Sequence, residues 1–135
     1  MTLVDTSAWV QVFRRQDPLD LSAVVPMDDV VTCLPVLQEV LQGFREERSF
    51  RLAREAMFAF PCVESPLTSA TVEEAVSLYR SARRQGLTIR SSIDCLIAAC
   101  ALRHDLEVLH SDRDFSSLSR VSALRERPLH RFDQK

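Results

Sequence analysis

Short apolar segments alternate along the chain with longer stretches in which apolar residues recur at helical spacing. The short segments predict strands at Thr2–Val4, Val30–Cys33, Cys62–Val63 and Val108–His110, and an edge strand within Val121–Phe132. Strands that alternate with helices favour a parallel sheet covered on both faces. The expected fold class is therefore α/β, as a three-layer α/β/α domain with a central, mainly parallel sheet.

Apolar residues three and four positions apart predict the helices between these strands. The helical stretches are Ser7–Arg15, Leu19–Val25, 36–44, Glu46–Phe60, 72–82, Ile93–Leu102 and Phe115–Leu118. Thr71 and Glu74 form a capping box that is expected to open the fifth of these helices, and Gly86 is expected to end it. The Ile93–Leu102 stretch is apolar nearly all round, which predicts a buried helix.

The composition is that of one globular domain spanning residues 1–135, with 46% hydrophobic and 27% charged residues. The net charge of −2 gives no overall attraction to nucleic acid, so any such contact must be local. The four cysteines contain no C-x-x-C pair and lie in apolar segments: Cys33, Cys62, Cys95 and Cys100. We therefore expect the cysteines to be small, reduced core residues of a protein in a reducing compartment.

The location expected for the chain is the cytoplasm. Its first residues carry no basic region and no long apolar stretch, so no signal peptide is expected. The longest wholly apolar run, Cys95–Leu102, is far too short to span a membrane.

Acidic residues recur at the ends of the apolar segments. Asp5 and Asp112 each follow a predicted strand, so both are expected at the carboxyl edge of the sheet. Glu39 lies at the border of an apolar helical stripe, and Asp94 lies at the start of the buried helix. Buried carboxylates are costly and would repel one another, and a divalent cation is the usual way to neutralise them. The pattern therefore predicts a metal site.

Each acidic residue also has an ordinary structural explanation when it is considered alone. Asp5 is a typical helix N-cap, and Glu39 can reach solvent from a helix border. Asp94 completes a capping box with Ser91, and Asp112 lies in a turn. The order of all these residues along the chain is what favours a common site.

That order resembles the PIN-domain ribonucleases, most closely the compact VapC-type toxins of bacterial toxin–antitoxin pairs. The similar stretches are Leu3–Trp9, Val36–Gly43, Gly86–Ala99 and Val108–Phe115, which together run over nearly the whole chain. Any one of these motifs is weak evidence, whereas all four in this order are fairly specific. One mild departure is Ser111, because the family more often has Thr there.

The resemblance implies a Mg²⁺- or Mn²⁺-dependent endoribonuclease that forms a homodimer and is inhibited by a cognate antitoxin. The catalytic acidic residues that carry over are Asp5, Glu39, Asp94 and Asp112. Metal ligands are expected among Asp5, Asp94 and Asp112. Supporting roles are expected for Thr6, Ser7, Ser111 and Asp114.

The RNA substrate must approach an acidic pocket on a slightly acidic protein, so basic residues are expected around that pocket. The candidates nearest in sequence are Arg14, Arg15, Arg90 and Arg113. A phosphatase with Asp-x-Asp after its first strand is disfavoured, because position 7 is Ser. Two alternatives stay open, a solitary PIN-type nuclease and a non-catalytic binding protein with an acidic patch.

Overall fold

The computed structural model describes residues 1–130 of the chain. Over these residues the strands are β1 (Thr2–Val4), β2 (Val30–Cys33), β3 (Cys62–Val63), β4 (Glu107–His110) and β5 (Glu126–Pro128). The α-helices are α1 (Thr6–Phe13), α2 (Leu34–Gln42), α3 (Glu47–Phe58), α4 (Ser69–Arg84), α5 (Ser92–Arg103) and α6 (Arg113–Ser119). The predicted helix at Leu19–Val25 is only a 3-10 turn over Leu21–Ala23. The tail strand is confirmed as β5, and Phe132 lies outside the described residues.

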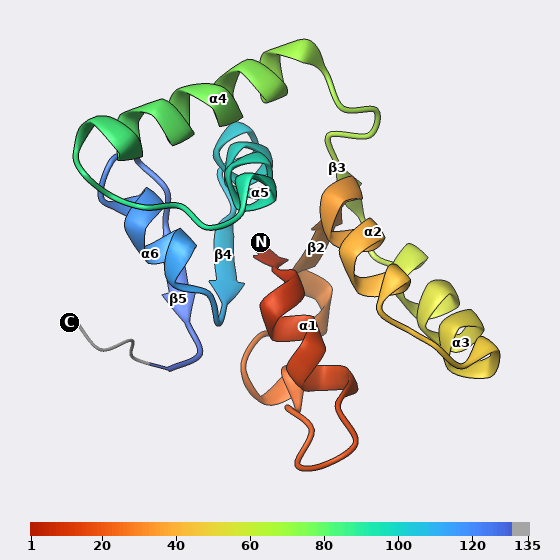
Figure 1. Ribbon diagram of the computed structural model, residues 1–135. Helices are drawn as coiled ribbons and strands as arrows, with labels where there is room; N and C mark the ends of the chain where they lie inside the picture. Colours follow the sequence, from red (N-terminus) through yellow and green to blue (C-terminus); the bar gives the residue numbers. More distant parts are fainter. Residues whose placement is uncertain (131–135) are drawn as a thin grey trace.

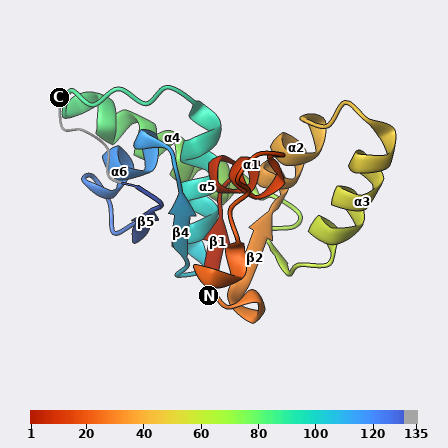
Figure 2. The same ribbon diagram turned by 90° about the horizontal axis from the view of Figure 1, so that it is seen from below.

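The strands form one parallel sheet in the order β3-β2-β1-β4-β5. The first strand therefore lies at the centre, beside β4, although the two are far apart in sequence (Figures 1 and 2). Their register pairs Val4 with Leu109, which brings the two carboxyl ends level. Strand order reverses between β1 and β4, and open parallel sheets bind ligands at such a switch point.

Helices cover both faces of the sheet, which gives the predicted α/β/α layers (Figures 1 and 2). Right-handed crossovers place connections that run in opposite directions along the sheet on opposite faces. The connections that contain α1, α2 and α3 run along the sheet toward β3, so these helices belong to one face. The connections that contain α4, α5 and α6 run toward β5, so these helices belong to the other face. The longest helix, α4, packs mainly against α5, which in turn packs on β4.

The core lies between the central strands and the helices on either side. Leu3, Val108 and Leu109 are fully buried, and α5 is buried along most of its length, as predicted. Cys33, Cys95 and Cys100 are buried as expected, whereas Cys62 is exposed because it begins the edge strand β3. Within the described part of the chain, no helix is both long and apolar enough to cross a membrane.

The start of α4 differs from the prediction. Thr68, one turn before Thr71, is the N-cap, because its hydroxyl oxygen accepts a hydrogen bond from the Thr71 amide at 3.4 Å. The hydroxyl of Thr71 is fully buried and donates to Glu64 at 2.7 Å, so it serves tertiary structure rather than a capping box. Gly86 follows the helix at φ 74°, a left-handed conformation that favours glycine.

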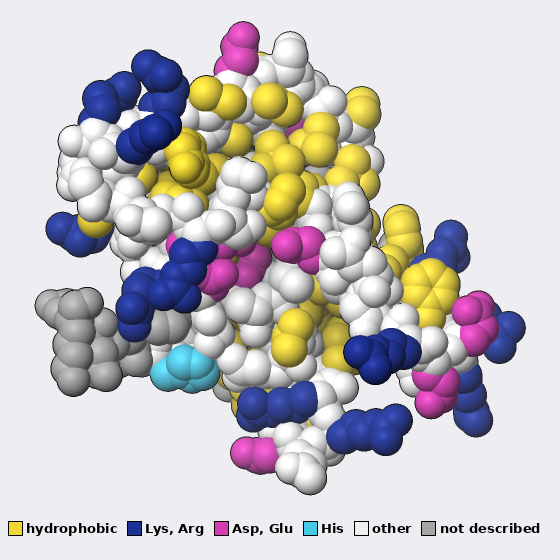
Figure 3. All heavy atoms as spheres, viewed as in Figure 1, with side chains coloured by type: hydrophobic (Ala, Val, Ile, Leu, Met, Phe, Trp, Pro, Cys, Tyr) yellow, Lys and Arg dark blue, Asp and Glu magenta, His cyan; other side chains and the backbone are white. Residues whose placement is uncertain are grey.

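The apolar positions of α4 do not all face the core. Ala75 and Ala82 are buried, but Val72, Val76 and Tyr79 are 47%, 52% and 37% exposed. These three side chains and Ile93 of α5 leave hydrophobic surface over the α4–α5 pair, which is visible in the upper part of Figure 3. We call this surface the α4–α5 apolar groove; its volume is about 390 Å³.

Candidate metal centre

Asp5 lies at the carboxyl end of β1, where it is the N-cap of α1. Its carboxylate oxygen Oδ2 accepts hydrogen bonds from the Ser7 amide at 2.9 Å and the Ser7 hydroxyl at 2.6 Å. The other oxygen, Oδ1, is buried and has no hydrogen-bond partner among the described residues. The N-cap explanation is therefore correct, and it accounts for only one of the two oxygens.

Asp94 lies in the first turn of α5 and is 4% exposed. It does not complete the capping box, because the Ser91 amide donates to Asp114 Oδ2 at 3.0 Å instead. Within residues 1–130 its Oδ2 atom is buried without a hydrogen-bond partner. The small residue Ala98, one turn along the same helix, is fully buried. An unpaired buried carboxylate oxygen costs free energy unless a ligand or cation satisfies it.

Asp112 and Asp114 occupy the turn between β4 and α6. Asp112 is the N-cap of α6, and its Oδ1 atom accepts a hydrogen bond from the Asp114 amide at 2.9 Å. Asp114 is 2% exposed and accepts from the Arg90 amide at 3.0 and 3.1 Å, one bond to each oxygen. With the Ser91 bond, its carboxylate thus ties the start of α5 to the start of α6.

Asp94, Asp112 and Asp114 offer carboxylate oxygens that all lie within 4.8 Å of one another. Acidic side chains gather at this position near the middle of the face in Figure 3. The expected ligand set was Asp5, Asp94 and Asp112, whereas this compact set contains Asp114, which was expected only in a supporting role. Asp5 lies close enough to raise the pKa of Asp94 through the repulsion between the two carboxylates.

The electrostatics of these residues fit a bound cation. Burial raises the pKa of Asp5 to about 6, mainly because the charged form loses its water. Burial also raises the pKa of Asp94 far above its usual range, and the neighbouring Asp114 carboxyl adds to the effect. Both carboxyls are therefore costly to ionise without a compensating positive charge. Carboxylate oxygens are the ligands that Mg²⁺ and Mn²⁺ prefer.

The expected supporting hydroxyls form a network around this cluster. The Ser7 hydroxyl donates to Asp5 and accepts from the Ser111 amide at 2.8 Å, so it joins the ends of β1 and β4. The Thr6 hydroxyl donates to Glu39 at 2.8 Å. The Ser111 hydroxyl shares a short hydrogen bond with the His130 ring. Glu39 is thus attached to the network through Thr6, and it lies outside the compact set of three carboxylates.

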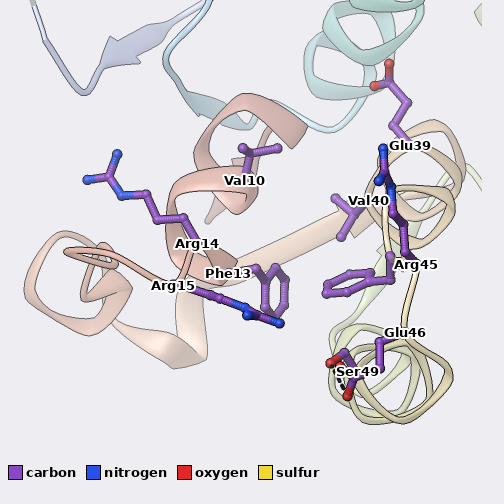
Figure 4. A pocket seen from close by; sticks show the side chains of 11 residues that line it. Val10, Phe13, Arg14, Arg15, Glu39, Val40, Arg45, Glu46 and Ser49 are labelled. Carbon is purple, nitrogen blue, oxygen red and sulfur yellow. Dashed lines mark hydrogen bonds between the residues drawn. The ribbon is translucent and has the colours of Figure 1, made fainter.

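A groove of about 430 Å³ runs from Glu39 along the junction of α1, α2 and α3. Figure 4 shows Arg14 and Arg15 on the α1 side and Arg45 on the opposite side, with Glu39 at one end. Phe13, which is 37% exposed, contributes an aromatic surface between them. We call this feature the arginine groove.

The predicted arginines differ in how they relate to this groove. Arg14 and Arg15 line it, and the Arg14 guanidinium also donates to the Asp17 carbonyl at 2.8 Å. Arg90 and Arg113 have exposed side chains elsewhere, although the Arg90 amide binds Asp114. Sequence reasoning missed Arg45, because it follows α2 far along the chain from α1 and only the tertiary fold sets it opposite Arg15.

Sequence comparison assigns most of the chain to a known family. Residues 2–121 match the family model of the PIN domain. A curated relative, ribonuclease VapC11 of Mycobacterium tuberculosis, is 33% identical over 129 residues, which cover 92% of this chain and 96% of the relative. The VapC ribonuclease Mb1587 of Mycobacterium bovis matches to the same extent.

Solved structures with the same fold include a member of the VapBC family of toxin–antitoxin systems. A structure of VapBC-5 from Mycobacterium tuberculosis aligns at a TM-score of 0.70 and 26% identity, covering 95% of this chain and 98% of that one. VapBC-1 from nontypeable Haemophilus influenzae gives a TM-score of 0.73 at 15% identity, covering 94% and 96% of the two chains. The second likeness concerns the fold alone.

The metal-free protein should lose stability as pH rises, because the folded-state pKa of Asp5 is raised from 3.8 to about 6. A raised carboxyl pKa stabilises the fold below pH 4, and that contribution is lost as pH rises through about 6. The shift corresponds to about 3 kcal/mol, at 1.36 kcal/mol per pKa unit. Urea denaturation in EDTA at pH 5 and pH 7.5 measures the part that is lost in this interval, about half of the total, and excess Mg²⁺ should restore stability at pH 7.5.

Asp5→Asn is the matched variant, because Asn keeps the N-cap and removes the charge. Its stability should depend less on pH than that of the parent protein, whereas Asp28→Asn, at an exposed position, should change nothing. An equal pH dependence in Asp5→Asn and the parent would contradict the assigned cost of ionising Asp5.

Proposed function

The chain belongs to the PIN-domain family, in the group of VapC ribonucleases, and on this premise we propose that it is a divalent-metal-dependent endoribonuclease and the toxin of a toxin–antitoxin pair. One observation carries the proposal. Carboxylates from the start of α5 and from the β4–α6 turn converge within 4.8 Å, at the switch point of the sheet. The ribonuclease names of its curated relatives support RNA as the substrate.

We assign the metal-binding role to Asp94 and Asp112, with Asp5 facing them. Mg²⁺ usually takes only one or two direct carboxylates in proteins. Asp94 Oδ2 and Asp5 Oδ1 are buried oxygens that no described residue binds, so both can take part in holding a cation. Asp114 already accepts three hydrogen bonds from two backbone amides, so its main task is to hold α5 against α6.

Bound there, the cation would neutralise charge on the scissile phosphate and lower the pKa of the attacking water. Glu39 is held by Thr6 at the end of the arginine groove, so it faces the path of the substrate. We assign to Glu39 the orientation of a water or the completion of a second cation site once RNA is bound. The Ser7 and Ser111 bonds keep the ends of β1 and β4 at a fixed distance.

Asp94→Asn should abolish Mg²⁺-dependent RNA cleavage while the protein stays folded. Asn is nearly isosteric but is neutral and donates where a cation needs a carboxylate. The loss should be at least about 100-fold, because metal stabilisation of the transition state is worth several kcal/mol. Cleavage of a panel of tRNA, rRNA and mRNA measures it, with Asp28→Asn as the exposed control. Full activity in Asp94→Asn would remove the proposed catalytic role of this cluster.

The arginine groove is the proposed path of single-stranded RNA into the centre. Phosphates would contact Arg15 and Arg45, and a base can stack on an exposed aromatic ring such as Phe13. The protein is acidic overall, so this local positive charge at the rim gives the required attraction.

Arg45→Ala should raise KM for RNA roughly fivefold and leave kcat nearly unchanged, because the contact is made equally before and during the reaction. The slope of log KM against log salt should fall by about one, as expected for one lost phosphate contact. Arg80→Ala, on an exposed position of α4 outside the groove, is the matched control. Equal KM values for the two variants would exclude this path.

We further propose a homodimer formed through the α4–α5 apolar groove, besides the complex with an antitoxin that the solved relatives suggest. A two-fold interface uses the same patch on both subunits, so it must be self-complementary. Here protruding side chains, Val76 and Tyr79, flank a hollow lined by Ala75 and Leu96. Burying this surface in a second copy would remove exposed apolar groups from water.

Val76→Glu should convert the dimer into a monomer, because it would bury an unpaired charge in the interface. Sedimentation velocity at micromolar concentration measures the mass. Leu52→Glu is the control, since Leu52 of α3 is 61% exposed and lies outside the groove. A dimer that survives Val76→Glu would place the interface elsewhere.

A further inference from the structure

The imidazole ring of His110 is completely buried at the end of β4, next to the acidic turn. Its Nδ1 atom accepts a hydrogen bond from the backbone amide of Asp112 at 3.1 Å. On the other side, Nε2 lies 3.7 Å from a carboxylate oxygen of Glu126 in β5. The ring also packs on Phe115 of α6, with 5.1 Å between the ring centroids.

These contacts determine which ring nitrogen carries the proton. A backbone amide can only donate, so Nδ1 must be unprotonated in order to accept from Asp112. A neutral imidazole then carries its proton on Nε2, the nitrogen that faces the Glu126 carboxylate. The two contacts therefore select the same tautomer, and Glu126 favours it by attracting the Nε2 proton.

We propose that His110, oriented by Glu126, is a positioning residue for Asp112, an inference that rests on the proposed metal-dependent nuclease function. The Asp112 amide begins the turn into α6, so fixing it also fixes the direction of the Asp112 carboxylate toward Asp94. A residue that only filled the core would be apolar at this depth, because a buried polar ring is costly without its hydrogen bonds. Second-shell partners of this kind commonly tune metal ligands.

The turn is thereby held from two sides. On one side the Ser111 amide donates to the Ser7 hydroxyl at 2.8 Å, and on the other the Asp112 amide donates to His110. The second contact links the metal centre to β5, which pairs with β4 in register from Glu126 to Pro128. The C-terminal strand thus takes part in shaping the site, although it contributes no ligand to the compact set.

The test compares two substitutions of the same residue. His110→Asn offers an amide oxygen near the place of Nδ1, whereas His110→Leu fills the volume without an acceptor. Binding of Mn²⁺ alone, followed by electron paramagnetic resonance, should weaken roughly 10-fold in His110→Leu and recover largely in His110→Asn. RNA cleavage should follow the same order in kcat, with KM unchanged. His104→Leu, at the exposed far end of α5, is the control for losing a histidine.

A second measurement uses the unaltered, metal-free protein, so it does not depend on the variants folding. The ¹⁵N resonances of the His110 ring should show an unprotonated Nδ1 and a protonated Nε2. A proton on Nδ1 would overturn the proposal, and so would equal Mn²⁺ affinity in His110→Leu and His110→Asn. Absence of RNA cleavage by the parent protein, with these Mn²⁺ and ¹⁵N results intact, would instead refute the proposed nuclease function.

Discussion

The structure depends on how dehydrated carboxylates are kept together at the carboxyl ends of β1 and β4. The parallel topology forces this convergence, because residues that follow neighbouring strands emerge at the same edge. Backbone amides at helix starts offset part of the cost, as Ser7 does for Asp5 and as Arg90 and Ser91 do for Asp114. These amides leave one carboxylate oxygen of Asp5 and one of Asp94 without a hydrogen bond. A cation shared by the two carboxylates would satisfy both oxygens, and this is the physical basis of the proposed function.

Much of the fold could be predicted from the sequence, because periodicity reports local structure directly. Val30–Cys33 is a strand with the predicted bounds, and Gly86 ends α4 with the left-handed φ that its position suggested. The errors arose where a tertiary contact overrides a local motif. Thr71 has the spacing of a capping residue, but its hydroxyl is drawn into the buried contact with Glu64. Helical spacing also does not say which apolar residues are buried: Val76 belongs to the pattern that predicted α4, and its side chain is 52% exposed.

The site could be predicted only in outline. Strand ends identified Asp5 and Asp112 as neighbours, since that inference needs only a parallel sheet. The central place of Asp114 could not be found in this way, because it depends on amides of Arg90 and Ser91 more than 20 residues away. The position of His110 is similar, as its partner Glu126 comes from a strand at the end of the chain. Such contacts are set by topology and packing rather than by spacing.

The most direct test of the central claim is a crystal structure of the protein soaked in Mn²⁺, with anomalous scattering recorded to locate the ion. A single strong peak is expected between Asp94 and Asp112 on the side that faces Asp5, within coordination distance of at least two of these three carboxylates. An ion bound elsewhere, or none at saturating Mn²⁺ with those carboxylates still gathered, would contradict the claim.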